Sequence, residues 1–553
     1  MQIVAFISRA SRRELWAMSA LTVAAGLSNA LLVVVINHVA ETVARGNQPS
    51  LWWAGTFSGS FVAYLYCSRR SMLGANTTIE RLLRNVRTQV TDKLRQSSLT
   101  AVDRVGRGTL ITVLAQETNH LSVSFPILVE NIQQTVLLLA SMIYLGSLSG
   151  PALAAFLGAV IVGIAGHMQV GKRFQKTQTQ IAVNQAALLD AIRDLIHGGK
   201  ELRLHRAKSD AVFAAYRKLS KSTEHLFTRS AGHWASQIVV GSFIMYNLLA
   251  VVVFIFPKYF GPAGPSLLPF RLVPVLLFCV GALSRIVAQS PMFLRAEMGL
   301  QAIAKVKQEL DDAGDVTTTA ARQLAEQFRD FEELTYSGIC FRHRSRSGEA
   351  VFQSGPWNLR LCRGELLFLV GGNGSGKSTV LRLLTGLYEA ESGQIALNGR
   401  TLTGKDLAGL REQFAAIFGD FHLFDRLYGM EDVDPKRVNE LIVEMELEEK
   451  VQFREGRFSE IHLSTGQRKR LALITAMLED RPIYVFDEWS AEQDVHFREA
   501  FYTRVLPGLK ARGKTVVAAT HDERYWHVAD RVIKMDLGTV VWERSGGDLG
   551  DMQ

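Results

Sequence analysis

The chain has 553 residues, of which 48% are hydrophobic and 21% are charged, and its formal net charge is +9. This length exceeds what one hydrophobic core supports, so we expect more than one domain. The basic residues lie between apolar runs rather than in one compact patch, which argues against a nucleic-acid-binding protein. The four cysteines have no paired or C-x-x-C spacing, so neither a disulfide framework nor a zinc site is expected.

Before about residue 300 the chain contains apolar runs long enough to cross a bilayer. Six spans are predicted, over residues 14–43, 52–74, 125–147, 151–171, 233–256 and 266–293. The hydrophilic stretches 69–124 and 171–232 hold most of the basic residues of this half, so the positive-inside rule places both in the cytoplasm. An even number of spans puts both termini on the same side. The sequence therefore predicts a multi-pass membrane domain over residues 1–310.

The two long cytoplasmic stretches contain helix-forming sequence, so we expect transmembrane helices to continue about 35 Å beyond the membrane. Glycines predict that the chain turns near residues 101–108 and 197–200. Residues 311–330 have no spanning pattern and are interpreted as a linker. The pattern of residues 331–553 is that of a soluble α/β domain that ends in a short flexible tail.

Polar groups within the predicted spans are candidates for a substrate pathway, because a bilayer penalises polar groups that face neither a cavity nor a partner. The candidates are Asn29, Asn37, His38, Gln133, Gln134, Asn247, Arg271 and Arg285. Each has a simpler interpretation, in which it holds neighbouring helices together. Arg285 is the strongest candidate, because it lies about 21 Å deeper along its helix than Arg271, beyond easy snorkelling from outside. There it could meet an acidic substrate.

The stretch GGNGSGKS has the spacing of a loop whose backbone N–H groups and lysine bind nucleotide phosphates. Lys377 is expected to contact the β and γ phosphates, Ser378 to hold Mg²⁺, and Thr379 to bind a phosphate oxygen. The alternative is a tight glycine-rich turn without a ligand. The predicted nucleotide-binding residues are Gly371, Gly372, Asn373, Gly374, Ser375, Gly376, Lys377, Ser378 and Thr379.

A second set of candidate residues follows two buried strands. The apolar run before Asp487 and Glu488 predicts a strand that delivers both carboxylates to its C-terminal end, where α/β proteins bind ligands. Asp487 is expected to orient Mg²⁺, and Glu488 to polarise the attacking water. His521 follows another strand-like run and is expected to contact the γ-phosphate. The alternative is that these side chains only cap strand ends.

The motif LSTGQ, which comprises Leu463, Ser464, Thr465, Gly466 and Gln467, lies between the phosphate loop and the acidic pair. In this order the motifs resemble those of ATP-binding-cassette (ABC) ATPases. The resemblance implies ATP and Mg²⁺ as ligands. It also implies that LSTGQ completes the ATP site of a second domain, so a chain with one ATPase domain is expected to form a homodimer.

Further segments resemble the ABC exporters of cyclic peptides and siderophores, of the pyoverdine and syringomycin type. They are FGDFHLFDRLYG at 418–429, LSTGQRKRLAL at 463–473, the sequence from 485 to 517, and GGKELRLH at 198–205. The resemblance implies that Ser490 to Asp494 connect the two ATP sites of a dimer. It also implies that the turns near 101–108 and 197–205 contact the ATPase domains.

Three positions depart from the general ABC pattern. Gly419 stands where a glutamine usually contacts magnesium, and Asp420 or His422 could take its place. Thr465 replaces a glycine of the signature. The adenine-stacking aromatic residue falls at His343, whose ring stacks more weakly than tyrosine, while Phe341 is expected to point into the core.

The resemblance implies a six-helix type IV ABC exporter membrane domain followed by an α/β P-loop nucleotide-binding domain. The expected function is ATP-driven export of a peptide or siderophore-like compound across a bacterial inner membrane, with the ATPase domain in the cytoplasm. One alternative is a lipid or multidrug exporter, or an exporter-fold siderophore importer. Another is an ATP-gated receptor or regulator without useful turnover.

Overall fold

The computed structural model describes residues 11–260, 268–311, 331–344, 350–404 and 406–545, together with Phe6, Ser8, Glu326 and Phe328. Contacts divide the chain into two compact units. The first comprises residues 1–89 and 111–304, and the second comprises residues 90–110 and 305–553. The predicted linker at 311–330 and the predicted tail after residue 545 lie almost entirely outside the described residues, so those boundaries stay predictions.

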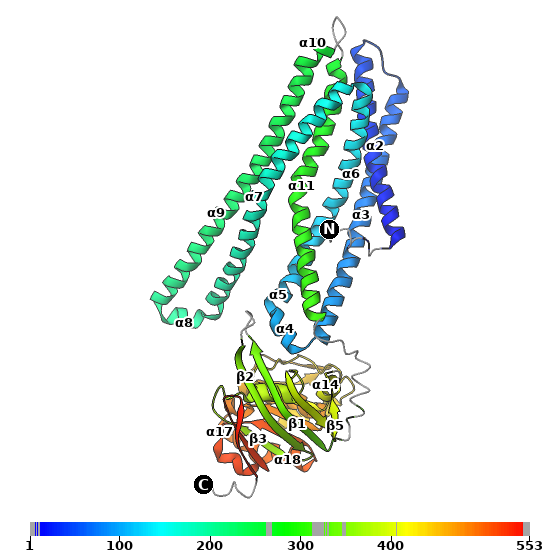
Figure 1. Ribbon diagram of the computed structural model, residues 1–553. Helices are drawn as coiled ribbons and strands as arrows, with labels where there is room; N and C mark the ends of the chain where they lie inside the picture. The colour runs from blue at the N-terminus through cyan, green and yellow to red at the C-terminus, as the bar shows by residue number, and fades with distance from the viewer. Residues whose placement is uncertain are drawn as a thin grey trace. The chain divides into compact units, whose positions relative to one another are not determined.

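Long helices make up the first unit (Figure 1). They are α2 (Arg12–Ala44), α3 (Leu51–Gln96), α6 (Thr118–Leu148), α7 (Gly150–His197), α9 (Arg206–Ala250) and α11 (Leu268–Asp311). Each overlaps one of the six predicted spans; α3, α7 and α11 continue well past the end of the span, whereas α9 begins well before it. The shorter elements are α4 (Leu99–Val105), α5 (Arg107–Ile111), η1 (Thr112–Glu117), α8 (Gly199–Leu204), η2 (Val251–Ile255) and α10 (Phe256–Phe260).

By length and composition, four described helical segments are apolar enough to cross a membrane. They are Arg12–Ala44, Gly108–Leu148, Arg206–Ile255 and Phe270–Leu310, whereas the apolar part of α7, Gly150–Gly166, is shorter. The second predicted span, in α3, is not among them. Its apolar residues are interrupted by Gly55, Thr56, Ser58, Gly59 and Ser60, which lower the mean hydropathy.

Helix pairs organise the first unit. α2 packs along α6, and at Gly26 the approach is so close that an added Cβ would lie 2.7 Å from the Cβ of Val136. Only glycine leaves room for that approach. α7 and α9 run side by side and are joined by α8, which has no buried residue (Figure 1). Buried apolar side chains of α2, α6, α7, α9 and α11 form a common core that includes Val33, Leu145, Phe156 and Leu276.

The second unit is built on two sheets. A six-stranded sheet has the order β12-β11-β3-β10-β9-β6 and is parallel except for β12, and an antiparallel sheet has the order β2-β1-β4-β5. The strands of the first are β3 (Leu366–Val370), β6 (Phe414–Ile417), β9 (Ile483–Asp487), β10 (Thr515–Ala519), β11 (Arg531–Asp536) and β12 (Thr539–Ser545). Those of the second are β1 (Glu333–Arg344), β2 (Ala350–Cys362), β4 (Ser392–Leu397) and β5 (Arg400–Leu402).

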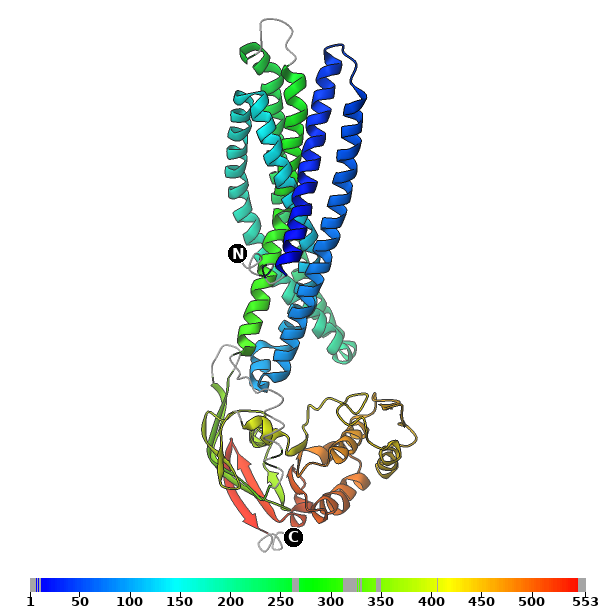
Figure 2. The ribbon, with the colours of Figure 1, turned by 90° about the vertical axis from the view of Figure 1, so that its right-hand side faces the viewer.

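Helical elements connect these strands. They are α13 (Lys377–Leu384), α14 (Leu407–Arg411), α15 (Pro435–Glu444), α16 (Thr465–Glu479), η3 (Trp489–Glu492), α17 (Val495–Ala500), η4 (Phe501–Val505), α18 (Leu506–Ala511) and η5 (Glu523–Val528). A small hairpin of β7 (Phe453–Arg454) and β8 (Arg457–Phe458) follows α15. Figure 2 shows the antiparallel strands and the orange helices, which include α16, on opposite sides of this unit.

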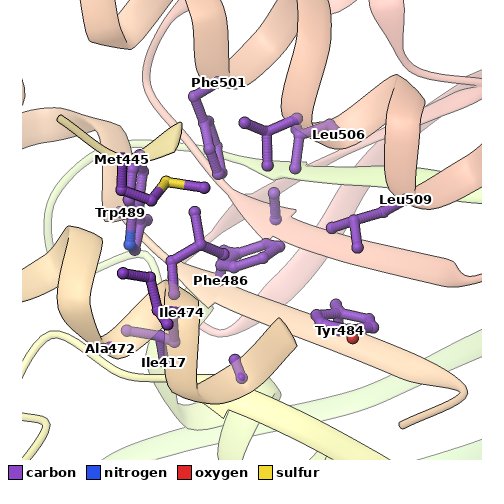
Figure 3. Close-up of a cluster of buried hydrophobic side chains, with 14 of the residues drawn as sticks. Ile417, Met445, Ala472, Ile474, Tyr484, Phe486, Trp489, Phe501, Leu506 and Leu509 are labelled. Atoms are coloured by element: carbon purple, nitrogen blue, oxygen red, sulfur yellow. The ribbon is translucent and has the colours of Figure 1, made fainter. Parts of the chain in front are cut away.

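Each central strand is apolar throughout because both faces of the parallel sheet are covered. Every residue of β3, β9 and β10 is buried. Phe486 faces a core with α16, η4 and α18, while the neighbouring Val485 belongs to a second core with α13 and the antiparallel sheet. Figure 3 shows the first of these cores, in which Phe501 lies between Phe486 and Trp489.

We expect Phe501→Ala to destabilise the second unit by about 3–5 kcal/mol, because the side chain is buried and its removal leaves a cavity. Its ring stacks on Trp489 at a centroid distance of 4.4 Å and meets Phe486 at 5.3 Å. The measurement is urea denaturation of the full chain in detergent, followed by tryptophan fluorescence. The matched control is Phe424→Ala, because Phe424 is exposed. Equal midpoints for the two variants would contradict the expectation.

Candidate functional site

The loop between β3 and α13 has a backbone that only glycine adopts readily. Gly371, Gly374 and Gly376 have φ angles of 149°, 80° and 99°. A Cβ at Gly371 would lie 2.3 Å from the carbonyl oxygen of Met535, so this position excludes any side chain. The tip, Gly372 to Gly374, is exposed. The loop therefore presents its backbone at the start of a helix, where N–H groups are available to an anion.

Lys377 is the first residue of α13, and its side chain is only 4% exposed. Its Nζ donates to the carbonyl oxygens of Gly371 and Gly372, at 2.9 and 3.1 Å. The Oε1 of Glu488 lies 3.3 Å from the same nitrogen, and the Nε2 of His521 also lies at 3.3 Å. The ammonium thus lies inside the loop, in contact with both candidate catalytic side chains.

Three neighbouring strands position these groups. β3, β10 and β9 are adjacent and parallel, so their C-terminal ends meet at one edge of the sheet. β3 leads into the loop, His521 follows β10 by one residue, and β9 ends at Asp487. Glu488 has a φ of 49°, and its Oε1 lies 2.6 Å from the Nε2 of His521. The left-handed backbone directs Glu488 away from the strand and towards the loop.

The two carboxyls have pKa values shifted in opposite directions. Burial raises the pKa of Asp487, although a hydrogen bond from Ser378 and another from the Gly419 backbone N–H oppose the shift. For Glu488, burial acts to raise the pKa, but hydrogen bonds and charge from His521 and Lys377 outweigh it and lower the pKa. Glu488 is therefore a stabilised carboxylate at neutral pH, as a group that polarises water must be.

The chemistry of the site fits Mg²⁺ and a phosphate ligand. The Oγ of Ser378 donates to the Oδ1 of Asp487 at 3.1 Å, so two hard oxygen ligands lie together beside the loop. Mg²⁺ binds few protein oxygens and completes its shell with phosphate and water. The Oγ of Ser375 is buried without a hydrogen-bond partner among the described residues. A buried hydroxyl without a partner at the floor of the loop is suited to a phosphate oxygen. Thr379 follows in the first turn of α13.

The LSTGQ segment forms the N-terminus of α16. Ser464 is the N-cap, and its side chain and that of Gln467 form a capping box. Thr465 begins the helix, so the missing glycine does not disturb it. Gly466 is required, because an added Cβ would lie 2.7 Å from the carbonyl oxygen of Glu492. Among the described residues, none of Leu463 to Gln467 has a hydrogen bond to the phosphate loop of its own chain.

Ser490 and Asp494, the predicted connection between ATP sites, are held by their own chain. The Oγ of Ser490 donates to the Oδ2 of Asp522 at 3.0 Å and lies 2.8 Å from the Tyr502 hydroxyl. Asp494 is the N-cap of α17 and forms an ion pair with Arg470 of α16. This segment is therefore fixed to α16 at one end and to the residues that follow His521 at the other.

Lys469, which was not predicted from the sequence, contacts the backbone of a candidate catalytic residue. Its side chain is 5% exposed and lies 3.1 Å from the Oε2 of Glu492, and its Nζ donates to the backbone carbonyl of Glu488 at 2.9 Å. The indole of Trp489 donates to the carbonyl oxygen of Lys469 at 3.0 Å. These contacts hold Glu488 in its left-handed conformation. A lysine next to the signature looks in sequence like a solvated basic residue, so no signal identified it.

The aromatic residues near the site are partly as expected. Phe341 is buried and stacks on Tyr388 with a centroid distance of 5.0 Å, so it points into the core. His343 is exposed and pairs with Phe352 across the β1–β2 ladder. Phe352 was not predicted. A Cβ at Gly376 would lie 3.0 Å from its Cζ, so this ring lies against the phosphate loop.

Asp420 and His422 could replace the missing glutamine, but neither forms a hydrogen bond with a magnesium ligand among the described residues. The Oδ1 of Asp420 is instead 3.4 Å from Arg382, and the ring of His422 lies against Phe424 at 4.8 Å. Gly419 reaches the site through its backbone N–H, which donates to Asp487.

Most of the polar residues of the membrane helices have partners within the chain. The Nδ2 of Asn37 donates to the hydroxyl of Tyr144 at 3.0 Å, and Gln133 accepts from Ser68 at 3.3 Å. The Nδ2 of Asn247 donates to a carbonyl of its own helix. His38 lies against the ring of Trp53, Gln134 is buried and Asn29 is partly buried.

Both arginines of the sixth predicted span form ion pairs. Arg271 lies 2.6 Å from Glu41, and Arg285 lies 3.4 Å from Glu130. The Oε2 of Glu130 also accepts from Gln289 at 3.1 Å. Arg285 therefore already has a counter-charge, which the sequence analysis did not assign. Its side chain is nevertheless 60% exposed, which leaves it accessible.

Comparisons with known proteins agree with this geometry. A sequence model of the family described as ABC transporter matches residues 355–491. The ATP-binding protein SyrD of Pseudomonas syringae pv. syringae is 28% identical over 530 residues, which cover 93% of this chain and 92% of SyrD. The ATP-dependent lipid A-core flippase of Xylella fastidiosa (strain 9a5c) is 28% identical over 412 residues, which cover 69% of this chain and 65% of the flippase.

A solved structure of a bacterial Atm1-family ABC exporter with ATP bound matches with a TM-score of 0.78. The match covers 97% of this chain and 96% of the exporter at 16% sequence identity, so it establishes the fold alone. The predicted fold class, a helical exporter membrane domain followed by an ABC nucleotide-binding domain, is confirmed. The similarity to SyrD confirms the resemblance to the syringomycin-type branch.

We expect His521→Ala to move the acidic limb of the pH profile of ATPase kcat/KM to higher pH. A lowered pKa keeps Glu488 ionised to lower pH, and loss of the His521 contact removes one cause of that lowering. The profile of kcat/KM reports groups of the free enzyme, which is the state described here. His422→Ala is the control, because this histidine contacts Phe424 instead. An unchanged acidic limb in His521→Ala would assign the limb to another group.

Proposed function

Because this chain is an ATPase coupled to transport, with an ABC ATPase domain and the exporter fold, we propose that it is a homodimeric exporter of a peptide or siderophore-like compound. It carries this cargo from the cytoplasm to the periplasm across a bacterial inner membrane. The observation that supports turnover is the cluster of Lys377, Glu488 and His521 beside the loop. A receptor that only binds nucleotide needs no group that polarises water, so the cluster argues against that alternative.

In this proposal the chain's residues position the reacting groups, which is most of what phosphoryl transfer requires. The loop N–H groups and Lys377 bind the phosphates, and His521 contacts the terminal phosphate. Glu488, freed from Lys377, orients water in line with the bond to be broken. Ser378 and Asp487 would hold Mg²⁺, which would supply positive charge against the phosphates. Lys469 holds the Glu488 backbone in place while the Glu488 carboxylate leaves Lys377 and orients water.

The dimer is supported by the position of LSTGQ. The N-terminus of α16 has exposed residues suited to an anion, and it makes no hydrogen bond to the loop of its own chain among the described residues. A second copy related by two-fold symmetry would place this helix end on the partner's nucleotide, giving two equivalent sites.

The nature of the cargo is supported by similarity to SyrD along nearly the whole chain. The lipid A-core flippase matches a smaller share, and it keeps lipid export as the second candidate.

The test is ATP-dependent uptake of a panel of peptides and siderophores into inside-out proteoliposomes. We expect Glu488→Gln to lose almost all hydrolysis and uptake while retaining ATP binding, because only the water-orienting carboxylate is changed. The control is Glu440→Gln, which makes the same change at an exposed position paired with Arg437. Both activities should match the wild type.

The other outcomes separate the alternatives. Uptake of lipid but of no peptide would favour the flippase-like candidate. Transport only when cargo is loaded on the opposite side would identify an importer. Equal slow hydrolysis in the wild type and Glu488→Gln would contradict a turnover enzyme and favour the receptor.

A further inference from the structure

Neither the backbone nor the packing requires a glycine at position 419. Its φ lies outside the left-handed region, and among the described residues no atom lies within 4 Å of an added Cβ, chain neighbours aside. A larger side chain would therefore fit. What the position contributes is its backbone N–H, which donates to the Asp487 carboxylate. The segment around Gly419 thus contacts the magnesium ligand without using a side chain.

The next residue connects this segment to α13. The Oδ1 of Asp420 lies 3.4 Å from an Nη of Arg382, and the guanidinium lies over the ring of Phe418 at 5.9 Å. Arg382 therefore contacts residues on both sides of Gly419. It is also in the helix that begins with Lys377 and Ser378. The arginine side chain is 25% exposed, so solvent screens its ion pair only partly.

Tyr388 lies on the other side of Arg382. The guanidinium lies 5.6 Å from the centre of its ring, and the ring is buried. Burial raises the pKa of Tyr388, Arg382 lowers it, and Asp103 raises it by charge and by a hydrogen bond. Asp103 belongs to α4, so the tyrosine hydroxyl interacts both with Arg382 of α13 and with a carboxylate of the segment that follows α3.

The short helix α4 is part of the ATPase unit rather than of the helical unit. Ser98 caps its N-terminus, and Leu99 packs against the core cluster that contains Tyr388. The Oγ of Ser97 donates to the carbonyl oxygen of Leu310 at 3.3 Å. α4 is also joined by two residues to α3, which contains the second predicted span. α4 therefore follows α3 directly along the chain.

We propose that Arg382 is a positioning residue that connects α4 to the magnesium ligand Asp487, through Tyr388 and Asp103 on one side and Asp420 on the other. We call these four residues, Asp103, Tyr388, Arg382 and Asp420, the Arg382 bridge. The bridge orients the backbone around Gly419, and that backbone orients Asp487. Position 419 has no side chain with which to orient the magnesium ligand, and side chains of α4 and α13 perform this role instead. The inference depends on ATP and magnesium binding, and it is independent of the cargo and of the direction of transport.

The experiment measures metal binding rather than turnover. The full chain carries Glu488→Gln to suppress hydrolysis, and Mn²⁺ replaces Mg²⁺ so that binding in the presence of ATP is read by electron paramagnetic resonance. We expect Asp103→Asn, Tyr388→Phe and Arg382→Gln each to weaken Mn²⁺ binding about two- to thirtyfold, the range found for residues that couple distant sites. ATP binding in EDTA should change much less, because none of the three contacts the phosphate loop through a hydrogen bond among the described residues.

Asp92→Asn is the matched control. It removes the same charge from the same cytoplasmic segment, but Asp92 is exposed and, among the described residues, bonds locally to Arg95 and Gln96. Its Mn²⁺ affinity should equal that of the parent. The double variant Asp103→Asn with Arg382→Gln should be no weaker than the weaker single variant, because both changes interrupt one path.

Two results would overturn the proposal. If Asp103→Asn and Tyr388→Phe bind Mn²⁺ as the parent does, α4 docks on the ATPase domain without influencing the metal site. If the effects of Asp103→Asn and Arg382→Gln multiply in the double variant, the residues act independently. Tyr388→Phe preserves the buried ring, so it keeps the test valid if Arg382→Gln folds poorly.

Discussion

The buried ammonium of Lys377 is the interaction on which the catalytic side of the ATPase domain depends. A charge with so little exposure must be paired and hydrogen-bonded, and here two loop carbonyls, Glu488 and His521 supply the partners. The glycine backbone of the loop makes this possible, because it brings carbonyls close to the helix start. Nucleotide phosphates would take over the role of Glu488 as the counter-charge. In the proposed mechanism, nucleotide binding would then release the carboxylate of Glu488, which contacts Lys377 in the structure.

Much of this site was predictable because its residues are fixed by local chemistry. A loop that wraps a phosphate needs glycines and a lysine at fixed spacing, and buried parallel strands are apolar runs that end in polar residues. The positions of Gly371–Ser378, Asp487, Glu488 and His521 follow from those constraints. The long helices were predictable for a similar reason, since a bilayer demands continuous apolar segments.

The remaining features depend on contacts between residues far apart in the chain, and sequence patterns do not encode such contacts. Lys469 and Arg382 look like ordinary basic residues on helices until the fold places Glu488 and Asp420 beside them. Glu130 was not considered as the partner of Arg285 because it lies 155 positions earlier, on a different helix. The division of the chain into two units also differed from the prediction at one segment. Residues 90–110 were assigned to the membrane half by position, but they belong to the ATPase unit, and Leu99 packs against one of its cores.

The exposure of helix α8 has a consequence for the newly made chain. None of its residues is buried, and Leu204 at its end and Ile196 just before it are 78% and 71% exposed. Exposed apolar side chains on a water-facing turn favour aggregation and are features that chaperones and proteases recognise. A single chain in which nothing covers these side chains would carry this liability, so its abundance in the cell need not be proportional to its expression level.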